Sequence, residues 1–432
     1  MDAHSRVLTV EKLVEGGWGL ARLDSEVVLL RGVLPREKVT VADAVEHKGY
    51  REAKVCALLE ASPDRVAPPC PVYGVCGGCQ FQHMGYEAQL DVKKTVLAET
   101  LWRLGKVHVE NISAPIPSPH PFGYRSTVRF VVFLDEKTFK LGFHQEHSHR
   151  PVEASGCLLA PEAMRVLISA IAERLRKKPR LPLHLESMEI RRSVTSGSHL
   201  LIHRAGPAGR DQAMRLVEVF ADLPDVVGQV VSVTRGRQGQ RWVQGQDWIA
   251  EELDGVIFHI SDRSFLQPNW HVNRLISRTL SEWVEPDRGP RILELYAGVG
   301  TLGLPLARRG ALVTEVEANR YAIADGRHAA KRNHVGRCRF RHLRAEAAVE
   351  GVGEGEYDLV VVDPPRTGLS PGCLQGLLRI AVPRLMYISC NAATLARDLS
   401  RLCVSGYRIA RVQPFDMFPQ TAHVEILVEL VR

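Results

Sequence analysis

The sequence predicts an α/β protein whose C-terminal part is a doubly wound parallel sheet. Strand and helix patterns alternate regularly from about residue 262 to the end. A glycine turn at 298–300 follows one apolar segment, Asp363-Pro364-Pro365-Arg366 follows a second, and Cys390 follows a third. All three signals therefore fall at the carboxyl ends of predicted strands, the edge at which open parallel sheets bind nucleotide-like ligands.

Length and composition narrow the class further. The 432 residues are enough for two or three domains. A formal charge of +7 mildly favours a polyanionic partner, and arginine is most frequent in the C-terminal half. No stretch approaches the roughly 18 apolar residues that a membrane span requires, and residues 1–10 lack the apolar core of a signal peptide. We therefore expect a cytoplasmic monomer without a membrane partner, in which the nine cysteines form no disulfides.

The chain divides into successive regions. Short alternating runs separated by glycines predict a small β-barrel over residues 1–62. Apolar residues at helical spacing predict a helix over 86–104, and four prolines in 112–121 predict a linker, so 86–119 forms a helix and linker that we expect to pack on the catalytic domain. Mixed signals in 63–85 and 120–260 predict a central α+β domain, and 261–432 forms the catalytic domain.

The glycine turn is a candidate cofactor site. Gly298 and Gly300 allow a tight turn that exposes backbone N–H groups at the start of a helix. The next predicted strand ends at Glu317, nineteen residues after Gly298, where a carboxylate can accept both hydroxyls of a ribose. Without a third glycine there is no pyrophosphate cradle, which favours S-adenosylmethionine over a dinucleotide. The alternative is an ordinary glycine loop followed by a solvated glutamate.

Cys390 is a candidate nucleophile. A thiol next to a bound methyl donor suits the methylation of a carbon atom of uracil. The C5 atom of uracil is too poor a nucleophile to attack the sulfonium of the methyl donor directly, so a thiolate must first add to C6 and generate an enolate at C5. A base must then remove the C5 proton, and His423 and Glu425 are the candidates. The alternative is that Cys390 is a buried small side chain and Glu425 a charge on an edge strand.

Four further cysteines are distinguished by their spacing. Cys70, Cys76 and Cys79 lie close together, and Cys157 is a distant fourth thiol. Four thiolates can bind zinc or an iron-sulfur cluster, and spacing alone does not choose between them.

Taken together, these motifs resemble the RNA uracil-5 methyltransferases. The resemblance spans nearly the whole chain in order, and it rests on the cysteine pattern just described and on the motifs Phe265-x-Gln267-x-Asn269, Tyr296-x-Gly298-x-Gly300, Asp363-Pro364-Pro365-Arg366, Ser389-Cys390-Asn391 and His423-Val424-Glu425. It implies a Rossmann-like class I methyltransferase domain preceded by a TRAM domain, an OB-like RNA-binding barrel. The barrel and the four cysteines resemble the branch that modifies 23S ribosomal RNA more than the transfer RNA branch.

The resemblance also implies roles for individual residues. Cys390 would be the nucleophile and Glu425 the proton acceptor. A 4Fe-4S cluster in the central domain would be bound by Cys70, Cys76, Cys79 and Cys157. S-adenosylmethionine would be bound by Gln267, Tyr296, Gly298, Gly300, Glu317 and Asp363.

This chain departs from the family pattern at several positions. Glu315 replaces a glycine, Arg344 stands where a small acid or amide usually meets the adenine, Thr301 replaces an asparagine, and Ala392 replaces a proline. The glutamate that binds the ribose is therefore a choice between Glu315 and Glu317, and the family register favours Glu317.

Two other functions remain open from sequence. One is the same chemistry on transfer RNA, and the other is a catalytically silent RNA-binding or assembly factor, which would not need Cys390 together with Glu425. RNA contacts are expected on the barrel and the central domain, because the target uridine must leave its stack. Phe122, Tyr124, Arg125 and Arg129 suit base stacking and phosphate binding, although they also fit a strand with one basic face.

Overall fold

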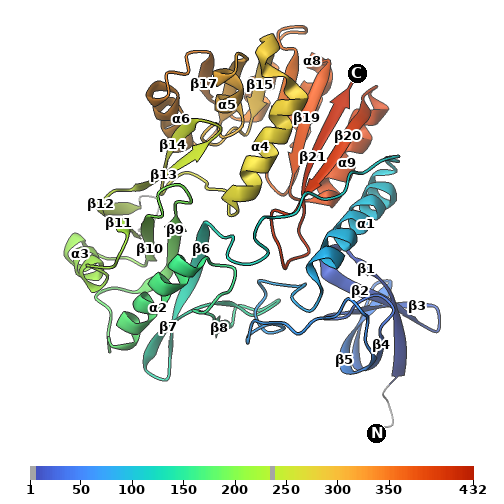
Figure 1. Ribbon diagram of the computed structural model, residues 1–432, viewed down its shortest axis with the longest axis vertical. Helices are drawn as coiled ribbons and strands as arrows, with labels where there is room; N and C mark the ends of the chain where they lie inside the picture. Colours follow the sequence, from blue (N-terminus) through green and yellow to red (C-terminus); the bar gives the residue numbers. More distant parts are fainter. Residues whose placement is uncertain (1–5, 234–238) are drawn as a thin grey trace.

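The computed structural model describes residues 6–233 and 239–432. Within these ranges the β-structure comprises a closed barrel, a seven-stranded central sheet, a two-stranded hairpin and a seven-stranded C-terminal sheet (Figure 1). The predicted α/β class, with an N-terminal barrel and a mixed central region, is confirmed.

The barrel closes in the strand order β1-β2-β3-β5-β4. Its alternating residues point inward, so Val10, Ala21 and Leu30 are buried. Gly19 allows the strands to approach closely, since a Cβ atom there would lie 2.2 Å from Cγ2 of Val33. The strands are β1 (Arg6–Val14), β2 (Trp18–Leu23), β3 (Glu26–Leu30), β4 (Lys38–His47) and β5 (Tyr50–Glu60).

Helix α1 (Tyr86–Gly105) confirms the predicted helix and packs against α9 (Ala392–Val404). Contact is close because a Cβ atom on Gly105 would lie 2.5 Å from the carbonyl oxygen of Ala396. The proline-rich segment that follows runs along β20 (Arg408–Phe415), where Ile116 N–H donates to the Pro414 carbonyl at 2.9 Å. Both segments therefore pack on the C-terminal sheet.

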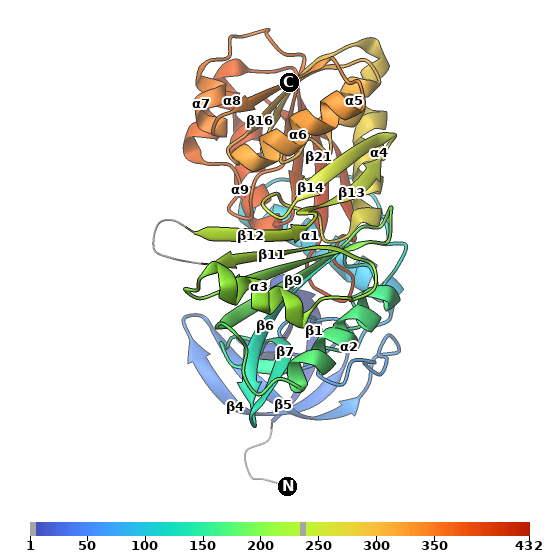
Figure 2. The same ribbon diagram turned by 90° about the vertical axis from the view of Figure 1, so that its left-hand side faces the viewer.

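The central sheet has the order β12-β11-β10-β9-β6-β7-β8. Helices α2 and α3 cover one face and share an apolar core with it. The other face contributes Leu200, Ile202 and Val230 to the core of the C-terminal domain, through the hairpin β13–β14 (Figure 2). The elements are β6 (Thr127–Asp135), β7 (Thr138–His144), β8 (Pro151–Glu153), α2 (Glu162–Arg176), β9 (Leu185–Arg192), β10 (His199–Ala205), α3 (Arg210–Val219), β11 (Val226–Val233), β12 (Gln240–Gly245), β13 (Trp248–Leu253) and β14 (Val256–Ser261).

The C-terminal sheet has the order β17-β16-β15-β18-β19-β21-β20, with β21 antiparallel to both of its neighbours. Helices α4, α5 and α6 pack on one face, and α1, α7, α8 and α9 on the other. The order reverses between β15 and β18, which is where a ligand crevice opens. The remaining elements are α4 (Trp270–Val284), β15 (Arg291–Leu295), α5 (Gly303–Arg308), β16 (Leu312–Glu317), α6 (Arg320–Arg332), β17 (Cys338–His342), α7 (Ala345–Glu350), β18 (Leu359–Val362), α8 (Pro371–Ile380), β19 (Arg384–Ser389) and β21 (Glu425–Val431).

Candidate active site

The loop after β15 forms the predicted glycine turn. Tyr296, Gly298 and Gly300 have φ angles of 63°, 57° and 83°, in the left-handed region that glycine adopts without strain. Gly298 N–H donates to a carboxylate oxygen of Glu317 at 3.0 Å, and Asn319 N–H donates to the other oxygen at 2.6 Å. Glu317 therefore lies beside the glycine turn at the carboxyl edge of the sheet.

Glu315 occupies a different environment. It pairs in register with Glu294 on the adjacent strand, and both side chains are buried. A Cβ atom on Gly303 would lie 2.3 Å from a Glu315 oxygen and 2.4 Å from a Glu294 oxygen, so the two carboxyls meet beneath the first turn of α5. This position lies inside the fold, which favours Glu317 over Glu315 as the carboxylate that faces a ligand.

Burial dominates the protonation of this carboxyl pair. It raises the pKa of Glu315 to about 7, and burial together with the Glu315 charge raises the pKa of Glu294 well above its ordinary value. Two carboxyls this close hold at least one proton at neutral pH, since both cannot ionise cheaply.

The other predicted cofactor residues are more dispersed. The half-buried Tyr296 side chain packs beside Cys373 at the start of α8. Gln267 lies half-buried in the loop between β14 and α4 and makes no hydrogen bond with another described residue. Asp363 follows β18, and burial raises its pKa to about 7.

Cys390 sits in a turn that is tied to the Asp363-Pro364-Pro365-Arg366 segment. Asn391 caps α9 by accepting from the N–H groups of Ala393 and Thr394. Its side-chain amide donates to the Arg366 carbonyl at 3.2 Å, and the Thr394 hydroxyl donates to the same oxygen at 3.2 Å. The turn that carries the thiol and the Asp-Pro-Pro segment are therefore held together.

Glu425 faces this thiol across two antiparallel strands. Ser389 pairs with Ile426, which places the preceding residue, Glu425, opposite Cys390. Burial raises the pKa of Cys390 to about 11, the Glu425 charge adds to this effect, and the Arg366 guanidinium opposes it. Burial and the nearby Asp363 likewise raise the pKa of Glu425 well above its ordinary value, again against Arg366. Burial therefore favours the neutral form of both groups.

His423 is the other candidate base. Its Nε2 atom lies 3.4 Å from Nη2 of Arg366, and burial lowers its pKa to about 4. His423 lines a cavity of about 140 Å³ together with Cys390, and the barrel residues Glu15 and Gly16 form part of the wall. The motifs predicted from the sequence contain Arg366 and Asn391 but assign neither a role, and the barrel loop reaches this site only through the tertiary fold.

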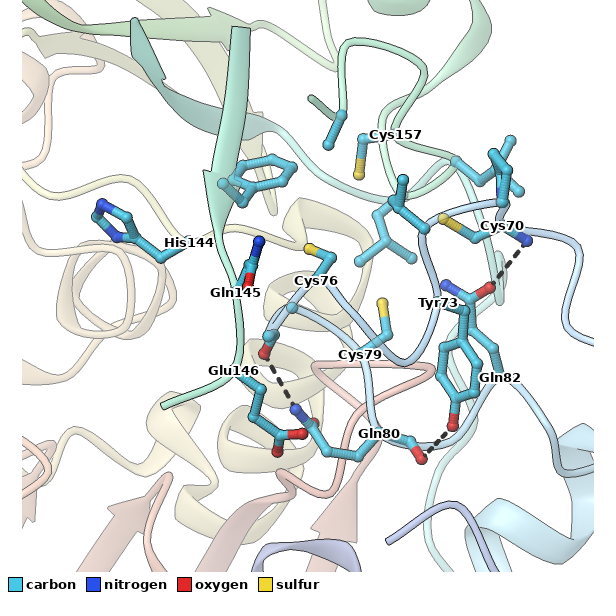
Figure 3. Close-up of a pocket in the computed structure, with 18 of the residues that line it drawn as sticks. Cys70, Tyr73, Cys76, Cys79, Gln80, Gln82, His144, Gln145, Glu146 and Cys157 are labelled. Carbon is cyan, nitrogen blue, oxygen red and sulfur yellow. Dashed lines mark hydrogen bonds between the residues drawn. The ribbon is translucent and has the colours of Figure 1, made fainter. Parts of the chain in front are cut away.

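The four predicted cluster cysteines surround a second cavity, of about 710 Å³ (Figure 3). Cys70, Cys76 and Cys79 come from the segment before α1, and Cys157 comes from the loop after β8. Within the described ranges, no group of three or more His, Cys, Asp or Glu side chains is arranged to hold a single metal ion. Ala422 and His423 line this cavity as well as the cavity at Cys390, so the two are adjacent.

The predicted RNA contacts at the start of the central sheet are partly wrong. Tyr124 is only 2% exposed and donates to the Pro419 carbonyl at 3.2 Å, so its ring cannot stack on a base. Arg129 forms an ion pair with the buried Glu189. No local pattern predicts this burial, because Pro419 lies 295 residues further along the chain.

Comparison with known proteins assigns the family. A family model described as tRNA (uracil-5-)-methyltransferase matches residues 85–432. The chain belongs to this family. It is therefore an RNA (uracil-5-)-methyltransferase by family, and the resemblance seen in the sequence is confirmed.

Individual relatives extend over nearly the whole chain. The 23S rRNA (uracil(1939)-C(5))-methyltransferase RlmD of Klebsiella pneumoniae is 34% identical over 431 residues, which are 98% of this chain and 95% of the relative. An uncharacterized RNA methyltransferase of Gloeobacter violaceus is 33% identical, over 100% of this chain and 97% of the relative. The crystal structure of Pyrococcus abyssi tRNA (uracil-54, C5)-methyltransferase in complex with S-adenosyl-L-homocysteine has a TM-score of 0.78 and 28% identity, covering 99% of this chain and 100% of that one.

No helix in the described part of the chain is both long and apolar enough to cross a membrane.

The carboxyl pair beneath the glycine turn predicts a pH dependence of stability. The folded-state pKa of Glu315 is about 7, above its ordinary value of 4.5, so the folded state retains a proton that the unfolded chain releases. The stability that this proton contributes is complete below pH 4.5 and is lost as pH rises to about 7. We expect Glu315→Gln to flatten the fall of the melting temperature between pH 5 and pH 7 relative to wild type. An unchanged slope, measured by thermal denaturation in matched buffers, would contradict the assignment.

Proposed function

We propose that this protein methylates C5 of uracil in RNA with S-adenosylmethionine, through a covalent bond between Cys390 and C6 of the base. The observation that carries the proposal is the placement of Cys390, directly after β19, opposite Glu425 at the start of β21, beside Asp363. A thiol that lines a small cavity, with a carboxyl opposite it on the neighbouring strand, suits addition to one face of a pyrimidine and proton removal from C5.

The proposed cofactor site is built on the glycine turn. Glu317 would accept the ribose hydroxyls at the topological switch point. The Gly298 and Gly300 N–H groups donate to Glu317 and to the Ala297 carbonyl, so the glycine turn would contribute its shape to the ligand site. Tyr296, Asp363 and Gln267 would complete the site. S-adenosylmethionine supplies an electrophilic methyl group when bound.

The chain's own residues account for the remaining steps. Cys390 must lose its proton before it attacks C6, and the nearby Arg366 guanidinium favours the thiolate. After methyl transfer, Glu425 takes the C5 proton, the C6–S bond breaks to release the Cys390 thiolate, and the C5–C6 double bond of uracil is restored. Burial makes Glu425 a stronger base than an exposed carboxylate, whereas the low pKa of His423 makes it a weaker one.

The cysteine cavity fits a 4Fe-4S cluster in its donor set. Four thiols from two separate segments line one cavity, and four thiolates are the usual ligands of such clusters. Cys70, Cys76, Cys79 and Cys157 would hold the cluster on the central domain side of the active site. A bound cluster would supply a rigid link between those segments.

We further propose that the substrate is 23S ribosomal RNA and that the barrel is a TRAM domain which contacts it. The barrel contributes to the wall of the Cys390 cavity, so an RNA bound there would lie next to the thiol. The similarity to the 23S rRNA methyltransferase of Klebsiella pneumoniae supports ribosomal RNA as the substrate. Transfer RNA is the second candidate, because the similar Pyrococcus abyssi structure is that of a tRNA methyltransferase. We expect a monomer in the cytoplasm. Mapping 5-methyluridine in total RNA from cells with and without the gene distinguishes the two substrates.

Loss of the thiol should abolish the reaction without affecting cofactor binding. Cys390→Ala removes the atom that adds to C6, while the glycine turn and Glu317 remain intact. We expect no methyl transfer to RNA, and a dissociation constant for S-adenosylmethionine within about twofold of wild type by calorimetry. Appreciable residual turnover would exclude the role of Cys390.

Loss of the carboxylate should trap the intermediate. Glu425→Gln leaves addition and methyl transfer possible but blocks removal of the C5 proton, so a covalent protein–RNA adduct should accumulate. With methyl-labelled cofactor, a denaturing gel should show a labelled upshift of the protein. The double variant Cys390→Ala, Glu425→Gln is the control, because it has no thiol to form the bond. Normal turnover by Glu425→Gln would assign proton removal to His423 or to water.

The metal content should identify the group in the cysteine cavity. We expect anaerobically purified protein to contain iron and acid-labile sulfide, and Cys76→Ser or Cys79→Ser to lose both. Cys56→Ser is the matched control, since this exposed thiol lies on the barrel outside the cavity. Stoichiometric zinc without iron would contradict the cluster.

A further inference from the structure

One edge of the catalytic sheet carries cationic side chains for which the proposed chemistry has no use. They lie on helix α6, on the edge strand β17 and in the turn before this strand, and all are exposed. We refer to them as the α6–β17 basic face. On α6 they are Arg320, Arg327, Lys331 and Arg332, and around β17 they are Arg337, Arg339 and Arg341.

These charges are unbalanced. Among the residues that the structure describes, no carboxylate oxygen lies within 4.0 Å of any cationic nitrogen of this face. Elsewhere in the same domain, the exposed Arg291 pairs with Asp358 and the exposed Arg309 pairs with Asp287. The sole acid between residues 320 and 344 is Asp325, which already accepts hydrogen bonds from Ser261 and Ser264. Such a concentration of one sign attracts a polyanion.

Helix α6 lies beside the hairpin β13–β14 (Figure 2), and side chains from both line a cavity of about 440 Å³ that adjoins the face. On one side, the rings of Trp248, His259 and His328 stack at centroid distances of 3.7 Å and 5.0 Å. On the other side, the Arg263 guanidinium lies 4.2 Å from the centre of the Tyr321 ring. Aromatic faces combined with guanidinium groups are how proteins bind the unstacked bases of single-stranded nucleic acids.

We propose that the α6–β17 basic face and this cavity form a second RNA-binding surface, which holds a segment of the substrate away from the target uridine. The inference rests on the proposed function, because it takes RNA as the substrate. Strand β17 lies four positions from β19 in the sheet, so the face is about 19 Å from the strand that leads to Cys390. A segment several nucleotides from the target would reach it.

The composition of the face favours RNA over an anionic membrane. Surfaces that bind membranes combine cations with exposed apolar side chains that insert between lipids. Between residues 320 and 344 no large apolar side chain is exposed. The aromatic rings of the cavity are instead stacked with each other and with guanidinium groups, which suits bases.

The test removes two charges from the edge strand. Arg339→Gln with Arg341→Gln should weaken binding of an unmodified 23S rRNA transcript about tenfold at 0.1 M salt, and should flatten the slope of log affinity against log salt by about 1.4 to 1.8. The kcat at saturating RNA should not change, because the face is remote from the thiol. His328→Ala should weaken binding about fivefold without changing the slope, because it removes a stacking surface and leaves every arginine and lysine of the face in place.

The matched control is Arg401→Gln with Arg408→Gln. It removes the same charge from exposed, unpaired positions on α9 and on the opposite edge strand β20, and it should bind within about twofold of wild type. If both double variants lose RNA affinity equally, the effect is one of net charge and the proposal is overturned. Wild-type RNA affinity in the Arg339→Gln, Arg341→Gln variant would overturn it as well. The wild type is also tested on phosphatidylglycerol vesicles. If only the Arg339→Gln, Arg341→Gln variant loses vesicle binding while its RNA affinity is unchanged, the face binds a membrane and not RNA. If the wild type binds the transcript but does not methylate it, the proposed substrate is wrong, while the comparison still tests the face.

Discussion

A buried ion pair between Lys93 and Asp416 fixes the segment on which the active site depends. Lys93 lies on α1, and Asp416 begins the segment between β20 and β21. The Tyr86 hydroxyl also donates to Asp416 at 2.8 Å, and Lys93 donates to the Phe418 carbonyl at 3.0 Å. Removing one partner of such a pair costs about 3–5 kcal/mol, because the other charge remains buried without compensation. A helix that precedes the catalytic domain therefore determines where β21, and with it Glu425, begins.

The same segment is held from its other side by the cysteine region. The Gln420 carbonyl accepts from the N–H groups of Gln80 and Phe81, each at 3.0 Å, and Ala422 N–H donates to the Gln80 side chain at 3.4 Å. Gln80 directly follows Cys79, and its side-chain amide donates a hydrogen bond to the Gly77 carbonyl at 3.1 Å. Any group that orders the cysteine cavity would therefore also order the approach to Glu425. This gives a physical reason for a methyltransferase to keep four cysteines that take no part in methyl transfer.

The parts of the site that the sequence predicted are those fixed by local geometry. The glycine turn, the Asp-Pro-Pro segment and Cys390 each follow a buried strand, and parallel strands bring their carboxyl ends to one edge. Glu425 was preferred to His423 only through the family resemblance, because nothing local indicates that β21 inserts antiparallel beside β19. The link from Asn391 to the Arg366 carbonyl and the burial of Tyr124 depend on contacts between distant segments, which periodicity does not encode.

The pKa shifts of Cys390 and Glu425 indicate that the Arg366 guanidinium acts in two successive steps of the proposed reaction. Burial opposes the thiolate of Cys390 and the carboxylate of Glu425, and the Glu425 charge further disfavours the thiolate. The proposed reaction does not need both anions together. The thiolate is consumed when it adds to C6, and only afterwards must Glu425 be ionised to take the C5 proton. Because Arg366 favours the charged form of both groups, its guanidinium can stabilise the thiolate first and the carboxylate later. A site with both anions present from the start would instead work against their mutual repulsion.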